Sequence, residues 1–248
     1  MTPNPILKVL STLKRHNTPA LLMGGQACIL YGGAEFSRDI DLAIPASPEG
    51  LQSLKNVLAE LAAQPVFVPP LESAYLEKGH ACHFRCNHPE AAGLRIDVLS
   101  RIRGCPEFPT LWRRRAEFDI PEIGPVAALS LSDLVQSKKT QRDKDWPMIR
   151  RLLEADYLLR RDTASPSDIR GWLAELRTPA YLAALARGNE AIRRNIPGRT
   201  WLAEPDIDED AIALHLDEEE KAVRQIDREY WTPLRRELEM LRHARSPS

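Results

Sequence analysis

The stretch Ser37-Arg38-Asp39-Ile40-Asp41-Leu42-Ala43-Ile44 decides the fold, because charged and apolar residues alternate along it. A β-strand places successive side chains on opposite faces. The apolar side chains at positions 40, 42 and 44 therefore share one face, and Asp39 and Asp41 share the other. The pattern predicts a strand that packs one face against a core and presents two neighbouring carboxylates on its opposite face.

Two further segments surround this strand in the predicted sheet. Upstream, the apolar run 20–23 ends at Gly24-Gly25, which is typical of a short buried strand that turns into a helix. Downstream, residues 80–87 and 93–100 indicate a strand pair joined by a loop. In the second of these strands Asp97 points away from the apolar face. Three carboxylates are thus expected on strands of one sheet.

The remaining patterns divide the chain into two parts. Helical spacing predicts helices over 5–16, 26–31, 48–62, 111–118, 131–140, 145–160, 167–176, 179–187 and 208–243. Short extended segments are expected at 66–68 and 120–129. A polar linker covers 161–167, and no strand signal follows it. We therefore expect an α/β (α+β) domain over residues 1–160 and an all-helical domain over residues 161–248.

Three carboxylates on a packed sheet face need cations, because an unpaired buried charge is costly. Mg²⁺ prefers a few carboxylate oxygens and completes its shell with water and substrate phosphate. Two such ions can activate an attacking oxygen and stabilise a leaving one. Gly24 and Gly25 are candidates for a close backbone approach to a phosphate. Further candidate phosphate ligands are Ser37, Arg38, Lys138 and Arg142.

The order of these motifs resembles the nucleotidyltransferases of the DNA polymerase β superfamily. The matching segments, in chain order, are Gly24-Gly25-Gln26-Ala27, Ser37-Arg38-Asp39-Ile40-Asp41-Leu42, and Arg95-Ile96-Asp97-Val98-Leu99. The segment from Ser137 to Asp145 resembles the closing motif of a small bacterial branch, which includes abortive-infection toxins of toxin–antitoxin systems. The resemblance covers residues 20–153 and stops before the C-terminal helices.

This resemblance implies a mixed sheet with flanking helices. It also implies Mg²⁺ held by Asp39 and Asp41, with Asp97 completing the metal site and drawing the proton from an acceptor hydroxyl. The implied reaction transfers a nucleoside monophosphate from an NTP and releases pyrophosphate. One position departs from the family: the branch often carries Arg four residues before the first Asp, where this chain has Glu35. Arg38 is a candidate substitute.

The acceptor is left open between RNA, protein and a small molecule. A basic cluster with aromatic neighbours, Arg101, Arg103 and Arg113–Arg115, suits RNA phosphates but equally suits an ion-paired surface, which we favour. His83 and Arg85 are interpreted as ordinary surface residues unless their strand neighbours that of Asp97. The rival hypothesis is a non-catalytic regulatory protein that keeps the fold, and Glu35 favours it.

Composition excludes several classes of protein. Apolar residues make up 43% and charged residues 28%, which is typical of a globular protein and not of a disordered chain. The formal net charge of -1 argues against a protein that coats polyanions over its whole surface. Neither an apolar run of membrane-spanning length nor a secretory signal is expected, so we predict a cytoplasmic protein.

Overall fold

The computed structural model describes residues 4–34, 36–205 and 208–245. They pack as two compact units. The first contains the described residues 4–30, 34, 36–137 and 228–245, and the second contains 31–33, 138–205 and 208–227. The sequence expectation placed a single division after residue 160, whereas the packing divides the chain after 137 and again after 227. The last segment returns to the first unit because Glu237 contacts His80 there.

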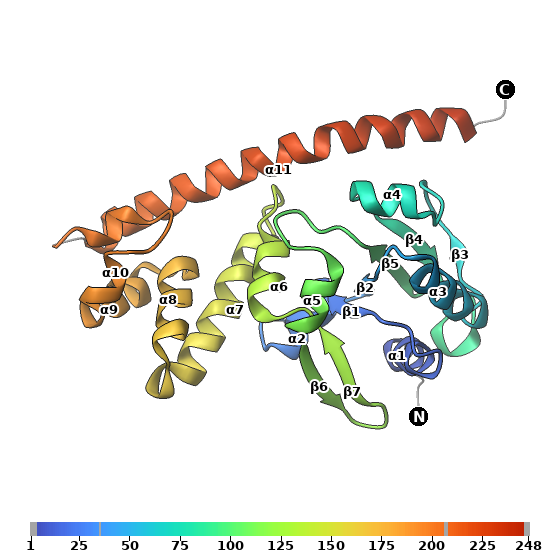
Figure 1. Cartoon of the computed structure of the whole chain (residues 1–248), viewed down its shortest axis with the longest axis horizontal. Coiled ribbons are helices and arrows are strands. Elements are labelled where there is room, and N and C mark those ends of the chain that lie inside the picture. Colours follow the sequence, from blue (N-terminus) through green and yellow to red (C-terminus); the bar gives the residue numbers. More distant parts are fainter. Residues whose placement is uncertain (1–3, 35, 206–207, 246–248) are drawn as a thin grey trace. The chain divides into compact units, whose positions relative to one another are not determined.

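The first unit is built on a seven-stranded mixed sheet in the order β3-β4-β5-β2-β1-β7-β6. The strands are β1 (Leu21–Met23), β2 (Asp39–Ala43), β3 (Gln64–Pro65), β4 (Cys82–Arg85), β5 (Arg95–Leu99), β6 (Ala116–Ile120) and β7 (Gly124–Ala128). The pairs β2–β5 and β1–β7 are parallel and the other pairs are antiparallel. The predicted mixed α/β class is confirmed, and Figure 1 shows β2 and β5 near the middle of the sheet.

Helices flank this sheet. They are α1 (Pro5–Arg15), α2 (Gly24–Leu30), α3 (Pro48–Glu60), α4 (Ser73–Lys78), η1 (Pro89–Ala91), α5 (Phe108–Arg113) and α6 (Leu131–Lys138). Asn4 caps α1 and Ser47 caps α3, and each helix has Pro in its first turn, which matches the expected start signals. α1 and α3 pack against each other, and their apolar faces are buried with the sheet residues Ile40, Leu42, Ile96 and Val98.

The second unit is helical. It contains α7 (Asp145–Arg160), η2 (Arg161–Thr163), α8 (Pro166–Glu175), α9 (Pro179–Gly188), α10 (Glu190–Arg193) and η3 (Thr200–Ala203). Helix α11 (Glu209–Arg245) supplies residues to both units. Ser165 and Asp168 form a capping box, so the expected polar linker ends at the start of α8. The expected all-helical character beyond residue 161 is confirmed.

One predicted helix is wrong. Residues 111–118 were expected to be helical, but α5 ends at Arg113 and β6 begins at Ala116. β6 pairs along its whole length with β7 in a hairpin at the sheet edge (Figure 1). Pairing within this hairpin overrides the weak helical pattern of the segment. Among the described residues, no helix combines the length and the apolar composition that crossing a membrane requires.

Candidate active site

The three predicted carboxylates lie on one face of the sheet. Asp41 on β2 is the register partner of Asp97 on β5, and Asp39 lies two residues earlier on β2. Residues at matching positions of neighbouring strands project from the same face. The alternation within β2 and β5 therefore delivers the carboxylates to one side and the apolar residues to the core, as the sequence predicts. Asp97 is only 6% exposed.

Arg95 holds two of these carboxylates together. Its Nη2 atom lies 2.8 Å from Asp39 Oδ2 and 2.9 Å from Asp97 Oδ2. One positively charged nitrogen thus contacts both carboxylates, which shows that Asp39 and Asp97 are close enough to share a single cation. Arg95 offsets the repulsion between the acidic side chains in the protein as it stands. The sequence leaves open a salt bridge of Asp97 to Arg95 or Arg101 as the alternative to a metal site, and the salt bridge to Arg95 is present here.

His83 reaches the same carboxylate from the other neighbouring strand. β4 pairs with β5, and His83 lies directly across from Asp97. The Nδ1 atom of His83 is 2.8 Å from Asp97 Oδ1. The favoured interpretation of His83 as an ordinary surface residue is therefore wrong, because β4 neighbours the strand of Asp97. His83, Asp97 and Asp41 form one row across three strands.

The two glycines make room for side chains of this site. Gly24 has a φ of +61°, and a Cβ atom there would lie 1.8 Å from Asp41 Oδ2. A Cβ atom on Gly25 would lie 2.4 Å from Ser37 Oγ. Glycine is thus required at position 24 both by backbone conformation and by contact with a site carboxylate. Sequence reasoning assigned the bare backbone of Gly25 to phosphate approach, whereas here Ser37 packs against it.

Hydrogen bonds fix the entry into β2. The side-chain amide of Gln26 donates to the carbonyl oxygens of Ser37 and Asp39, each at 3.3 Å. The hydroxyl of Ser37 also donates to the Asp39 carbonyl at 3.1 Å. These bonds tie the start of α2 to the backbone that carries the first carboxylate. Gln26 belongs to the quoted Gly-Gly-Gln-Ala segment, but its type alone did not reveal this role.

Arg38 is the candidate substitute for the family arginine that Glu35 replaces. Arg38 is exposed, and its guanidinium forms no ion pair with any residue in the described part of the chain. Its charge is therefore available to an anion at the start of β2. Glu35, the departure from the family pattern, lies outside the described residues.

Lys138 and Arg142 belong to the second unit and converge on Asp145. Arg142 Nε lies 2.7 Å from Asp145 Oδ2, and Lys138 Nζ lies 3.4 Å from Asp145 Oδ1. Thr140 Oγ1 donates to Asp145 Oδ2 at 2.6 Å. Asp145 is 2% exposed, so the two cations neutralise a buried carboxylate. This contact accounts for the residue types in the closing motif without a nucleotide.

The donor set of the site suits a hard divalent cation. It consists of carboxylate oxygens, which Mg²⁺ prefers. The positively charged Arg95 side chain already contacts both Asp39 and Asp97. In this arrangement, no three His, Cys, Asp or Glu side chains among the described residues are grouped as a metal site. The oxygen chemistry of Asp39, Asp41 and Asp97 thus fits the ion, whereas their arrangement here has Arg95 between two of them.

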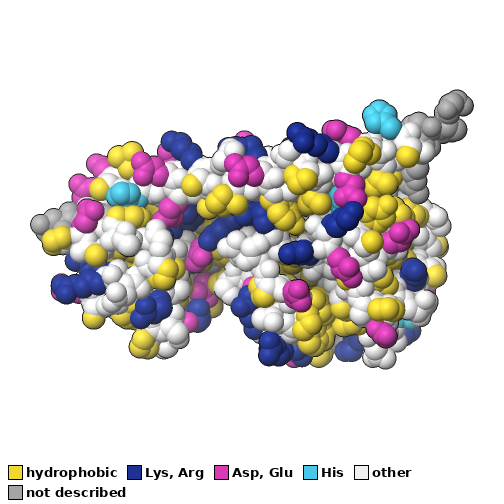
Figure 2. Space-filling view, turned by 45° about the horizontal axis from the view of Figure 1, so that its top comes forward, with side chains coloured by type: hydrophobic (Ala, Val, Ile, Leu, Met, Phe, Trp, Pro, Cys, Tyr) yellow, Lys and Arg dark blue, Asp and Glu magenta, His cyan; other side chains and the backbone are white. Residues whose placement is uncertain are grey.

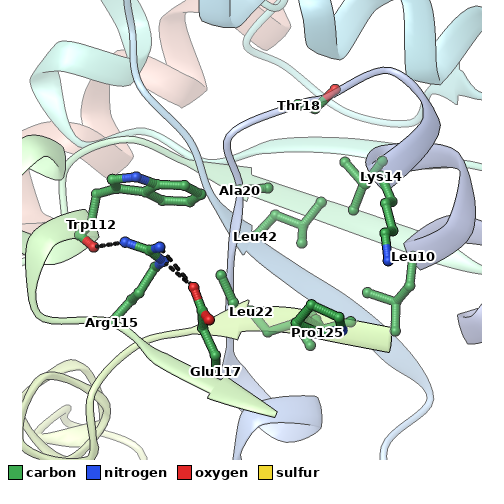
Figure 3. A pocket seen from close by; sticks show the side chains of 13 residues that line it. Leu10, Lys14, Thr18, Ala20, Leu22, Leu42, Trp112, Arg115, Glu117 and Pro125 are labelled. Carbon is green, nitrogen blue, oxygen red and sulfur yellow. Dashed lines mark hydrogen bonds and ion pairs between the residues drawn. The ribbon is translucent and has the colours of Figure 1, made fainter. Parts of the chain in front are cut away.

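A separate pocket lies on the opposite face of the sheet (Figure 3). Its volume is about 210 Å³, and Leu22 and Leu42 form part of its apolar lining. Leu42 alternates with Asp41 along β2, so this pocket faces away from the carboxylates. At its rim Arg115 stacks over the Trp112 ring and pairs with Glu117. The pocket is therefore distinct from the carboxylate site.

The expected basic cluster is mostly paired. Arg114 makes a two-point contact with buried Asp133, and Arg115 pairs with Glu117. Figure 2 shows Lys and Arg side chains interspersed with Asp and Glu side chains over the face in view. The ion-paired interpretation of Arg114 and Arg115 is confirmed, and only Arg113 of the three consecutive arginines lacks a carboxylate partner within the described residues.

Comparison with known proteins gives two similar solved structures, both from Helicobacter pylori. One, a candidate nucleotidyltransferase, is 12% identical, with 91% of this chain and 94% of that chain covered and a TM-score of 0.40. The other, JHP933, is 13% identical, with coverages of 93% and 94% and a TM-score of 0.32. No family model matches the chain, and no curated protein does. TM-scores this low do not establish function, which must be argued from the residues themselves.

Proposed function

We propose that this protein is a magnesium-dependent nucleotidyltransferase that moves a nucleoside monophosphate from an NTP to an acceptor hydroxyl. The observation that carries the proposal is the register match of Asp41 with Asp97, with Asp39 on the same face of β2. Three carboxylates on adjacent strands, placed there by a buried apolar face, are a costly arrangement that a divalent cation would relieve. The resemblance of the motif order to the DNA polymerase β superfamily supports the same chemistry.

The site residues would have separate roles in metal binding and proton transfer. Asp39, Asp41 and Asp97 would hold Mg²⁺, which supplies charge stabilisation for the phosphoryl oxygens when bound. Asp97 would accept the proton of the acceptor hydroxyl, and His83 Nδ1 would keep that carboxylate oriented. The acceptor oxygen forms a bond to the α-phosphorus while the bond to the departing pyrophosphate breaks.

The donor nucleotide would bind on the β1–β2 side of the carboxylates. Gly24, Gly25, Ser37 and Arg38 are the candidates there, by resemblance and because Arg38 is an exposed cation beside Asp39. Lys138 and Arg142 were expected to contact the triphosphate. Their contacts with Asp145 favour a structural role instead, and the proposal does not depend on them.

Calorimetry with each NTP in the presence of Mg²⁺ tests the proposal directly. Wild-type protein should bind at least one NTP, and transfer of label from that NTP to a component of cell extract should depend on Mg²⁺. Asp41→Asn should abolish transfer while the far-ultraviolet circular dichroism spectrum stays unchanged. The matched control is Asp119→Asn, an exposed carboxylate on β6. Absence of Mg²⁺-dependent NTP binding by the wild type would overturn the proposal.

A second candidate function is a non-catalytic regulatory protein with the same sheet. The contact of Arg95 with both Asp39 and Asp97 favours it, because a cation of the chain itself already pairs with two of the three carboxylates. Thermal shift separates the two candidates, since a ligand that binds only the folded state raises its melting temperature. A catalytic protein should be stabilised by NTP only with Mg²⁺, and a regulatory one should be indifferent to both.

The finer proposal is a toxin component of a toxin–antitoxin pair, and it rests on the resemblance of the closing motif alone. Expression of the wild-type chain in bacterial cells should then arrest growth, and expression of Asp41→Asn should not. Equal growth with the two chains at equal protein levels would contradict a toxin role and leave the transferase chemistry to the calorimetric test.

A further inference from the structure

The carboxylate face continues onto β4 with groups that the proposed chemistry does not use. Arg85 lies across from Arg95, one row along from the pair of His83 with Asp97. Because His83 and Arg85 are two residues apart on one strand, both project from the face that carries the carboxylates. Arg85 is exposed, and its guanidinium forms no ion pair with any residue that the structure describes.

The placement of Arg85 is unfavourable by itself. Two like charges at directly opposite positions of an antiparallel pair destabilise a sheet. Arg95 is relieved by contacts with Asp39 and Asp97, whereas Arg85 has no comparable partner in the described chain. A bound anion would relieve Arg85 in the same way, so this position suits a phosphate group.

An exposed aromatic ring stands beside the same row. Phe67 follows β3 and is 49% exposed. Its ring meets the ring of His83 edge to face, with the centroids 5.7 Å apart, and His83 in turn contacts Asp97. A solvent-facing ring is therefore one side chain away from the carboxylate proposed to accept the proton. Such a ring offers a stacking surface to a nucleobase.

The strand order separates this surface from the donor side. Ser37 and Gly25 lie next to β2 and β1, whereas Arg85 and Phe67 lie on β4 and just after β3, with β5 between the two groups. A transferase binds its donor and its acceptor on different sides of the reacting carboxylates. Because the proposed donor binds beside β1 and β2, the acceptor is expected beside β3 and β4.

We propose that Phe67, His83 and Arg85 form the acceptor subsite, and that it takes the terminal nucleotide of a single-stranded nucleic acid. The base stacks on Phe67, the backbone phosphate pairs with Arg85, and the terminal hydroxyl lies toward Asp97. This inference rests on the proposed function and names its substrate class. A free mononucleotide carries the same chemistry, so the test includes it as a competitor.

Binding is measured by fluorescence anisotropy with a labelled single-stranded RNA of about 12 nucleotides, within the usual site size of such surfaces, and without NTP. Phe67→Ala and Arg85→Ala should each raise Kd at least about fivefold, consistent with the loss of one stacked base or one charged contact. Phe67→Trp should restore binding. Arg85→Ala should also lower the slope of log K against log salt concentration by about 0.7.

The matched controls are residues of the same type elsewhere. Phe36→Ala removes the exposed ring that precedes Ser37, and Arg187→Ala removes an exposed arginine of α9. Each control should change Kd for the RNA less than about twofold, since surface substitutions away from a contact have small effects. An RNA hairpin without a free single-stranded end should bind at least about fivefold more weakly, and excess AMP should compete only weakly.

Several outcomes overturn the acceptor subsite. Unchanged RNA affinity in Phe67→Ala and Arg85→Ala would do so, and so would complete displacement by AMP at equal concentration. If Phe67→Ala and Arg85→Ala weaken NTP binding but leave RNA binding unchanged, these residues belong to the donor side. The acceptor subsite would then be refuted, and the proposed function would not. RNA binding through Phe67 and Arg85 in a wild type that binds no NTP would refute the proposed function and the acceptor role together.

Discussion

Arg95 contacts Asp97, two residues further along β5, at 2.9 Å, and so places a cation of the chain itself in the carboxylate site. The same nitrogen contacts Asp39 on β2. The chain itself therefore offsets part of the negative charge of the site, and a divalent ion that binds Asp39 and Asp97 has to compete with a guanidinium. Whether the carboxylates bind Mg²⁺ can therefore be tested by measuring how the melting temperature responds to Mg²⁺ with and without Arg95.

Arg95→Ala should make the protein more dependent on Mg²⁺. Without a divalent ion, Asp39 and Asp97 lose their shared cation, and repulsion should lower the melting temperature. Added Mg²⁺ should then raise it by roughly 3 °C more than in the wild type, because binding to the folded state is no longer opposed. Differential scanning fluorimetry across a Mg²⁺ titration measures this. Arg85→Ala is the control, and equal Mg²⁺ responses of all three proteins would contradict the expectation.

Gly24→Ala should destabilise the protein through two separate effects. A left-handed residue with a side chain costs about 1–2 kcal/mol, and the added Cβ would in addition overlap Asp41 Oδ2. Gly93 has a similar positive φ but open space around it, so Gly93→Ala isolates the first effect. Urea denaturation should show the larger loss for Gly24→Ala. Equal losses would mean that Asp41 moves aside without cost.

Asp145→Asn should weaken the second unit. The buried carboxylate of Asp145 contacts Lys138, Thr140 and Arg142. Removal of its charge leaves Lys138 and Arg142 without a negatively charged partner. We expect a loss of about 2 kcal/mol in the free energy of unfolding. Asp143→Asn removes a carboxylate that is 97% exposed and should cost less than about 0.5 kcal/mol. Similar small losses in urea denaturation for both variants would refute a structural role of Asp145.

The C-terminal segment of α11 should loosen from α4 in acid. The hydrogen bonds from His80 and then Lys78 lower the pKa of Glu237 below its ordinary value of 4.5. A carboxyl group with a depressed folded-state pKa contributes stability above its unfolded pKa and loses it as pH falls through the folded one. The hydrogen-exchange protection factors around Glu237, corrected for the intrinsic pH dependence of amide exchange, should therefore fall below about pH 4.5. Glu237→Gln should remove this dependence, whereas Glu239→Gln, an exposed control on the same helix, should retain it.

Most of the local structure could be predicted from the sequence. The alternation in β2, the start of α3 at Pro48 and the long α11 follow from periodicity and capping residues, which act within a few positions. The segment 116–120 could not, because its strand depends on pairing with β7 and its own pattern is ambiguous. The sequence also does not reveal that Ser37 packs against Gly25, because these two residues meet only in the folded chain.

The sequence by itself determined that Asp39 and Asp41 share a face and that Asp97 faces away from its own apolar neighbours. Side-chain direction along a strand is a local property of the backbone. The folded unit was needed to bring Asp97 opposite Asp41, to place Arg95 between two carboxylates, and to set His83 and Arg85 of β4 across from β5. Which strands become neighbours depends on how distant segments bury their apolar faces together, and that is a property of the whole folded unit.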